Sequence, residues 1–111
     1  GTGNKVEDFG VGFYTKYGDG GVDISPIADC NKTEVWELGK ELGILKEIID
    51  APPTDGLWDD GRTDEGQLGL SYKELEEAMD NENSVNRDKY NSIRSANLHK
   101  MEPIPVCKIP N

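Results

Sequence analysis

The proline pair Pro52-Pro53 and the polar, glycine-rich run that follows it over residues 54–67 constrain the fold most strongly. Each proline lacks an N–H donor and restricts the residue before it, so a helix cannot continue through this point. A loop as long as 54–67 inside a small domain is usually functional or disordered. The 111 residues are therefore divided into short helical regions on either side of one long loop.

The region before the prolines carries the signals of a short helix. Asn31 and Glu34 have the spacing of a capping box, and Gly43 suits the position after a helix C-terminus. We therefore expect a helix from Asn31 to about residue 42. Apolar residues at helical spacing predict a buried stripe on it: Val35, Leu38 and Leu42.

Two further helices are expected after the loop. Ser71 and Glu74 form a second capping-box pattern, and Leu75 and Met79 lie four residues apart on the helix that follows. A last helix is predicted over residues 85–98. Three apolar residues are expected on one side of it: Tyr90, Ile93 and Leu98.

The remaining segments give weaker signals. A helix over residues 5–15 is weakened by Gly10 and Gly12, and a short helix is expected over residues 46–50. Three prolines keep the C-terminal tail, residues 101–111, extended. The chain is thus α-rich and is predicted to be the second half of an α/β unit.

Charge and composition exclude several classes of protein. The net charge is −10, which disfavours nucleic-acid binding because phosphates would repel it. No run approaches the roughly 18 apolar residues of a membrane span. Residues 50–82 hold 11 acids and 2 bases, whereas residues 83–111 carry a net charge of +3. Cys30 and Cys107 are too few for a disulfide framework, so a reduced, intracellular protein without a secretory signal is expected.

Common site motifs fail on spacing. An EF-hand loop that starts at Asp55 or Asp59 lacks the glycine required at position six. A dinucleotide fingerprint beginning at Gly1-Thr2-Gly3 would need glycine in place of Val6. His99 is the only histidine, so a histidine metal cluster is excluded. Beside Lys100, it suits either a surface position or a joint contact with an anion.

A series of blocks nevertheless follows the order and spacing of one family. They are Gly-Thr-Gly-Asn-Lys-x-Glu at 1–7, Thr-Lys-Tyr-Gly-Asp-Gly-Gly-x-Asp at 15–23, Pro-Ile-Ala-Asp-x-x-Lys-Thr-x-Val at 26–35, Pro-Pro-Thr at 52–54, Thr-Asp-Glu at 63–65, Leu-Gly-x-Ser-Tyr at 68–72, and His-Lys at 99–100 with prolines after it. Over nearly its whole length the chain resembles the C-terminal part of NAD synthetase, either the ammonia-dependent type or the synthetase domain of the glutamine-dependent type.

The resemblance implies an α/β fold. Residues 1–111 would be the C-terminal, helix-rich half of a Rossmann-like (adenine nucleotide alpha hydrolase-like) ATP-pyrophosphatase domain. The family's Ser-Gly-Gly-x-Asp-Ser phosphate-binding loop and the strands that carry it are absent from the sequence. We therefore expect the chain to be a fragment, or part of a longer chain, that is inactive alone.

The resemblance also implies an activity. NAD synthetases are carbon–nitrogen ligases that adenylate nicotinic acid adenine dinucleotide with ATP and Mg²⁺. Ammonia then displaces AMP and gives NAD. A cytoplasmic homodimer that acts on small molecules, with no nucleic acid and no membrane as partner, is the corresponding expectation.

Site residues are carried over from the matching blocks. Thr2, Lys32 and Thr54 would contact ATP. Glu7 would ligate Mg²⁺, which prefers oxygen ligands. Four further residues would bind the deamido-dinucleotide, in part across a dimer interface: Lys16, Asp23, His99 and Lys100. The acidic loop over residues 54–67 would be a mobile lid that excludes water from the adenylate.

Two other functions stay open. The chain could be a non-catalytic acidic interaction module of the same ancestry, or a related ATP-pyrophosphatase with another acceptor. The source of ammonia, free or from a glutaminase, is not fixed by the sequence. Asp64 and Glu65 are candidates for handling the ammonia proton only by their position in the loop.

Overall fold

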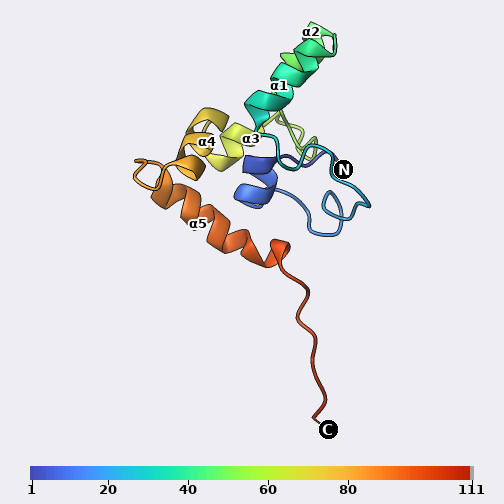
Figure 1. Ribbon diagram of the computed structural model, residues 1–111, viewed down its shortest axis with the longest axis vertical. Helices are drawn as coiled ribbons and strands as arrows, with labels where there is room; N and C mark the ends of the chain where they lie inside the picture. The colour runs from blue at the N-terminus through green and yellow to red at the C-terminus, as the bar shows by residue number, and fades with distance from the viewer. Residues whose placement is uncertain (111) are drawn as a thin grey trace.

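A computed structural model describes residues 1–110 as short helices joined by loops (Figure 1). The helices are the π-helical turn η1 (Lys5–Gly10), α1 (Lys32–Glu41), α2 (Lys46–Ile49), α3 (Asp64–Leu68), α4 (Tyr72–Asp80), α5 (Arg87–Asn97) and the 3₁₀ turn η2 (Leu98–Met101). No β-strand occurs in residues 1–110. The helix-rich character is confirmed, whereas the sheet of the expected α/β domain has no counterpart in the structure.

The N-terminal helix is shorter and wider than expected. The predicted helix over residues 5–15 is a single π-helical turn, in which the Val11 N–H donates to the Val6 carbonyl at 3.0 Å. Gly12 follows with φ of +80°, a left-handed conformation that stops the helix and that glycine adopts at little cost.

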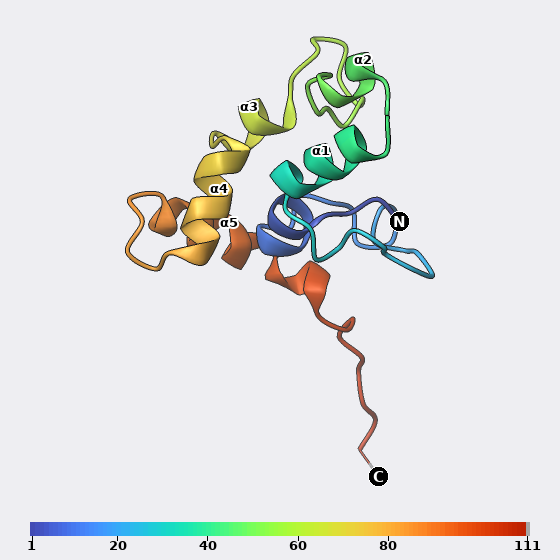
Figure 2. The ribbon, with the colours of Figure 1, turned by 45° about the horizontal axis from the view of Figure 1, so that its top comes forward.

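Helix α1 begins and ends where the sequence predicts, but its stripe is not buried. The Glu34 carboxylate accepts a hydrogen bond from the Asn31 N–H at 2.8 Å, and Gly43 has φ of +73°. None of the residues of α1 is buried, and Leu38 and Leu42 are 45% and 76% exposed. The prediction of a buried stripe is therefore wrong within this structure, because α1 and α2 project from the rest of the molecule (Figures 1 and 2).

The predicted loop over residues 54–67 ends earlier than expected. Thr63 caps α3 by accepting a hydrogen bond from the Gly66 N–H at 3.1 Å. The acidic residues Asp64 and Glu65 stand in the first turn, where they interact favourably with the helix dipole. The irregular loop is thus residues 54–63, and α3 leads directly into α4.

Helices α4 and α5 agree more closely with the sequence. Both halves of the Ser71–Glu74 capping box are present, at 3.1 and 3.2 Å. Helix α5 covers most of the predicted span, but Leu98 is 39% exposed and starts the 3₁₀ turn instead of joining the buried side.

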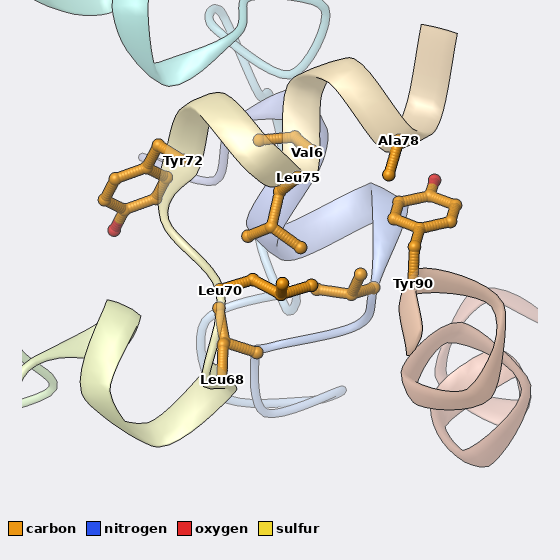
Figure 3. Close-up of a cluster of buried hydrophobic side chains, with 8 residues drawn as sticks. Val6, Leu68, Leu70, Tyr72, Leu75, Ala78 and Tyr90 are labelled. Atoms are coloured by element: carbon orange, nitrogen blue, oxygen red, sulfur yellow. The ribbon is translucent and has the colours of Figure 1, made fainter. Parts of the chain in front are cut away.

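The hydrophobic core lies where α4 packs on η1 and α5 (Figure 3). Its buried members are Val6, Val11, Leu68, Leu70, Tyr72, Leu75, Ala78 and Tyr90. We call η1 together with α3, α4 and α5 the body, and α1 together with α2 the arm. The extended tail runs away from the body on the side opposite the arm (Figure 1). Within the described residues, no helix is long and apolar enough to cross a bilayer.

Candidate functional site

A buried ion pair joins the first turn of the chain to the start of the arm. Lys32 Nζ lies 3.1 Å from Glu7 Oε1, and the two side chains are only 18% and 7% exposed. The Lys32 ammonium also stands over the Tyr72 ring at 5.3 Å from its centre. Lys32 is therefore held by a carboxylate and an aromatic face together.

Asn4 and Asp8 surround this pair. Asp8 Oδ2 accepts a hydrogen bond from the Asn4 backbone N–H at 2.7 Å. Oriented by its hydrogen-bond network, the Asn4 amide donates to Glu7 Oε1 at 2.8 Å and to Asp8 Oδ2 at 2.9 Å. Asn4 is 1% exposed, so its amide bridges two carboxylates out of solvent contact.

Asp64 is a further buried carboxylate near Lys32. The Tyr72 hydroxyl donates to Asp64 Oδ2 at 3.2 Å, and the Asp64 N–H donates to the Pro53 carbonyl at 2.9 Å. Asp64 Oδ1 and Glu7 Oε2 are buried without a hydrogen-bond partner. Two carboxylate oxygens at this site are thus free to accept a ligand.

Burial makes these acids easier to protonate than usual. It raises the pKa of Glu7 to about 7, although the Lys32 ammonium opposes the rise. Burial likewise raises the pKa of Asp8 to about 6. The pKa of Asp64 is raised by burial against the hydrogen bond from Tyr72, and burial, followed by the nearby Glu7, raises the pKa of the Tyr72 phenol.

Glu7 suits Mg²⁺ as a single protein ligand. Mg²⁺ in nucleotide sites is commonly bound by one or two carboxylates together with substrate phosphates. The unpartnered Glu7 Oε2 offers one such oxygen. Within residues 1–110, no group of three or more His, Cys, Asp or Glu side chains is arranged as a complete metal site.

Two of the residues predicted to bind ATP face one pocket. Lys32 and Thr54 line a cavity of about 480 Å³ together with Trp36, Ile49 and Pro53. The third, Thr2, lies on the exposed N-terminal segment. The structure therefore brings Lys32, Thr54 and the neighbouring Glu7 together but leaves Thr2 outside this cluster.

Three of the four residues predicted to bind the dinucleotide, Lys16, His99 and Lys100, form a second group at η2. Lys16 Nζ donates to the His99 carbonyl at 2.9 Å and to the Glu102 carbonyl. Lys100 Nζ donates to the Gly12 carbonyl at 2.8 Å. Asp23 lies on an exposed loop and is not part of this group.

The basic C-terminal stretch is largely occupied by backbone carbonyls. Arg87 donates to Ala78 and Met79, and Lys89 donates to Gly69. Arg94 donates to Phe9 and Gly10, and Lys100 donates to Gly12. Four of its five bases thus bind the protein itself, which is a structural use of charge that the sequence alone did not reveal.

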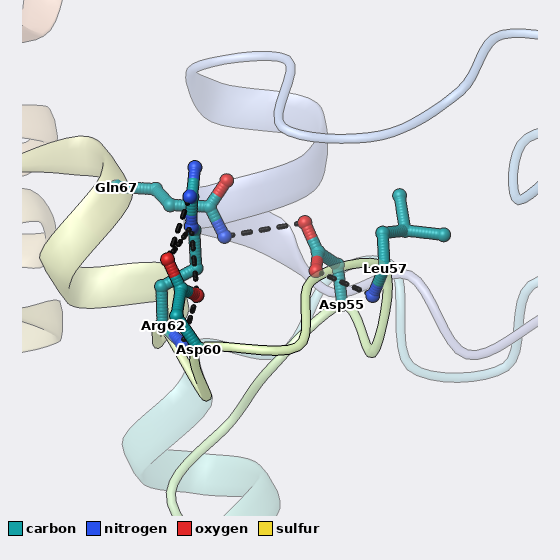
Figure 4. A network of polar contacts seen from close by, with 5 residues as sticks. All are labelled: Asp55, Leu57, Asp60, Arg62 and Gln67. Atoms are coloured by element: carbon teal, nitrogen blue, oxygen red, sulfur yellow. Dashed lines mark hydrogen bonds and ion pairs between the residues drawn. The ribbon is translucent and has the colours of Figure 1, made fainter.

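The loop over residues 54–63 borders a cavity at each of the two groups. At its base, Pro53 and Asp64 are joined by a backbone hydrogen bond. Asp55 and Leu57 line a cavity of about 200 Å³ with Tyr14 and Lys100. Figure 4 shows the polar contacts that organise the loop: Asp55 with Leu57 and Gln67, and Asp60 with Arg62.

Comparison with known proteins decides the family. The sequence matches the family model described as NAD synthase over residues 1–108. The chain belongs to the NAD synthase family. An NH(3)-dependent NAD(+) synthetase from Alkaliphilus oremlandii is 48% identical over 111 residues, which cover 98% of this chain and 44% of the relative. The protein of that name from Methanosarcina acetivorans is 53% identical over 79 residues, 71% of this chain and 30% of the relative.

A solved structure is also similar to the chain. The structure of NMN synthetase from Francisella tularensis superposes with a TM-score of 0.83 at 32% identity, covering 96% of this chain and 45% of that one. The chain therefore spans less than half the length of these relatives.

Three residues of the site were not assigned from the sequence. Asn4 and Tyr72 lie inside the recognised blocks at 1–7 and 68–72, and Asp8 follows the first block directly. Their convergence depends on contacts between segments more than 60 residues apart, which spacing does not show.

Proposed function

We propose that this chain supplies part of the active site for ATP-dependent amidation of nicotinic acid adenine dinucleotide to NAD⁺, with ammonia as the nitrogen donor. The observation that carries the proposal is the buried Glu7–Lys32 pair beside the Thr54 pocket. By the resemblance these three residues would serve metal and ATP, and contacts link them although up to 47 positions separate them: Lys32 pairs with Glu7 and shares a cavity with Thr54.

The reaction requires activation of a carboxylate, which is a poor electrophile. A nicotinate carboxylate oxygen attacks the α-phosphorus of ATP, and pyrophosphate leaves. Ammonia then attacks the carbonyl carbon of the acyl-adenylate, AMP leaves with the electron pair of the broken bond, and the amide nitrogen loses a proton. The enzyme must hold two anionic substrates with their reacting atoms in contact.

The ATP side is formed by Lys32, Thr54 and Thr2. Lys32 would place a positive charge against phosphate oxygens, and Thr54 would donate a hydroxyl hydrogen bond at the mouth of the same pocket. Glu7 would ligate Mg²⁺ through the oxygen that has no partner in the protein. The metal ion would neutralise charge that develops on the phosphates.

The dinucleotide side is formed by Lys16, Asp23, His99 and Lys100. Backbone carbonyls now accept the hydrogen bonds of both lysine ammonium groups, so substrate binding would exchange some of these contacts. We propose a homodimer in which the partner copy completes this side.

The loop over residues 54–63, the irregular part of the predicted lid segment 54–67, would act as the lid. Its support is that it borders both cavities, at Thr54 on one side and at Asp55 and Leu57 on the other. Closure over both substrates would exclude the water that hydrolyses an acyl-adenylate. Asp64, at the end of this loop, is the better placed of the two candidates for the ammonia proton because it is buried and Oδ1 has no partner.

Residues 1–111 would be the C-terminal portion of the synthetase domain, and the preceding half would bring the phosphate-binding loop. We therefore propose that this stretch is inactive alone and that the intact protein works in the cytoplasm.

The test is NAD⁺ formation by the intact protein from the deamido-dinucleotide, ATP, ammonia and Mg²⁺. Lys32→Ala should lower kcat/KM about a hundredfold, by loss of one preorganised charge. Lys46→Ala is the matched control, because Lys46 is an exposed lysine of the arm and pairs only with Asp50. Absence of NAD⁺ from the wild-type protein, or equal activity of the two variants, would refute the proposal.

A mononucleotide acceptor is the second candidate. The observation that favours it is the likeness to the solved structure titled NMN synthetase. Competition between nicotinic acid mononucleotide and the dinucleotide separates the two: the preferred substrate has the higher kcat/KM. If neither is amidated, a non-catalytic module of the same ancestry becomes the better account.

A further inference from the structure

The π-helical turn η1 carries the acidic side of the site. Turns of this kind are rare and occur frequently at functional sites. Hydrogen bonds from Phe9 N–H to the Asn4 carbonyl, at 3.4 Å, and from Val11 N–H to the Val6 carbonyl span five residues instead of four. This widened turn places Glu7 beside Lys32 and Asp8 beside Asn4.

Arg94, on α5, binds the end of this turn. Its Nη1 donates to the Gly10 carbonyl at 2.6 Å and to the Phe9 carbonyl at 3.0 Å. The two segments are tightly packed, since a Cβ added to Gly10 would lie 3.2 Å from the Tyr90 hydroxyl. Tyr90 and Arg94 are four residues apart and so share one face of α5.

This contact has a geometric consequence for Glu7. The last carbonyls of a helix have no intrahelical donor, and a guanidinium satisfies them and their partial negative charge. A π turn holds one residue more than an α turn, which corresponds to about 100° of helical rotation. Relaxation of η1 to α-helical spacing would therefore turn Glu7 away from Lys32.

We propose that Arg94 is a positioning residue that holds η1 in its π-helical form and thereby aims the Glu7 carboxylate. Arg94 lies 87 positions from Glu7 and acts through backbone carbonyls, without touching substrate or metal. The inference rests on the proposed function, in which Glu7 ligates Mg²⁺.

Arg87 provides a matched control on the same helix. Its Nη1 also donates to two carbonyls, Ala78 at 2.6 Å and Met79 at 3.0 Å. These carbonyls belong to the end of α4, which carries no residue of the ATP or metal site apart from Tyr72 at its other end. Arg87 thus makes the same kind of contact with two backbone carbonyls as Arg94 does, but these carbonyls belong to α4 and not to η1.

The experiment uses the intact protein and three variants, Arg94→Met, Arg94→Lys and Arg87→Met. The Mg²⁺ concentration for half-maximal activity is measured beside kcat and the melting temperature. Arg94→Met should raise that concentration about tenfold, as loss of an outer support of a metal ligand does. Arg94→Lys should recover part of the loss, and Arg87→Met should lower the melting temperature without changing the Mg²⁺ requirement.

Hydrogen exchange gives a readout that does not need turnover. Amides of residues 9–13 should exchange faster in Arg94→Met than in Arg87→Met, because the first variant releases η1. Equal Mg²⁺ requirements and equal exchange in the two methionine variants would overturn the role of Arg94 and leave the proposed function standing. An unchanged Mg²⁺ requirement in Glu7→Gln would instead overturn the proposed metal role of Glu7, and with it the proposed function of that residue.

Discussion

The body and the arm use their apolar residues in opposite ways. Leu75 and Val6 in the body have no exposed surface, whereas Leu42 and Leu45, in the turn that joins the two helices of the arm, are 76% and 66% exposed. Both regions have apolar residues at helical spacing and well-formed helix ends. Helical spacing therefore shows which residues share a face, but burial of that face depends on another segment packing against it.

The largest expected difference between the two regions is in core stability. Leu75→Ala removes a wholly buried side chain and should lower the free energy of unfolding by about 2–5 kcal/mol. Leu42→Ala removes an exposed side chain and should change it by less than about 0.5 kcal/mol. Denaturant unfolding of the two variants measures both values.

A result that breaks this comparison would be informative. If Leu42→Ala lowers the free energy of unfolding as much as Leu75→Ala does, the apolar face of the arm is covered in solution. The cover is then either a second copy of the chain or a further segment of the protein. Dependence of the Leu42→Ala effect on protein concentration would identify the second copy.

The next largest effect is a pH dependence confined to the body. The pKa of Glu7 is raised from 4.5 to about 7, so the folded state holds a proton that the unfolded state has lost between these values. The contribution of Glu7 to stability is therefore fully present below pH 4.5 and is lost as the pH rises through 7. In metal-free buffer the free energy of unfolding of the wild-type protein should fall by on the order of 2 kcal/mol over this pH interval, and Glu7→Gln should abolish that fall.

Asp60 is the control for this titration. It is an exposed loop residue whose pKa is lowered by its hydrogen bonds to Arg62, so its contribution is lost only on acidification below the usual range of aspartate. Asp60→Asn should leave the dependence of the free energy of unfolding on pH unchanged between pH 5 and 7. Equal slopes for wild type and Glu7→Gln would mean that Glu7 stays ionised in the folded protein.

A smaller effect is expected at the hydroxyl of Tyr72. Tyr72→Phe keeps the ring beneath Lys32 but removes the donor to Asp64, and a buried acceptor left without its partner costs about 1–3 kcal/mol. Tyr17→Phe, at a side chain 68% exposed, should be neutral. If Tyr72→Phe is equally neutral, solvent or Lys32 satisfies Asp64 instead.

The sequence predicted local structure well where the cause is local. The Ser71–Glu74 box and the Gly43 terminus depend on neighbouring residues, and both are confirmed. Helix α3 was missed because its five residues are too few to show a period, although Thr63 followed by two acids is a typical helix start. The π form of η1 was also missed, since it depends on Arg94 from the other end of the chain.

The family blocks named candidate site residues but did not show how their side chains are arranged. In the structure Lys32 pairs with Glu7 and lines one cavity with Thr54. The ring and hydroxyl of Tyr72, which link Lys32 to Asp64, were not foreseen because cross-chain contacts leave no spacing signal. The assigned roles of all eight site residues stay predictions until tested.

The smallest effect belongs to the loop between arm and body. Arg62 pairs with Asp60 at 2.7 Å and stacks over the Trp58 ring at 4.0 Å, yet all three side chains are about half exposed. Exposed pairs of this kind contribute about 0–1 kcal/mol, so Arg62→Ala should lower stability by no more than that. Trp58 emission should nevertheless shift, because the ring loses its cationic neighbour, and Trp58→Phe controls for the signal of Trp36. A loss of more than about 2 kcal/mol would show that the fold depends on this loop, as it does on the body. It would also count against a role as a lid, because a lid must open at a low cost in free energy.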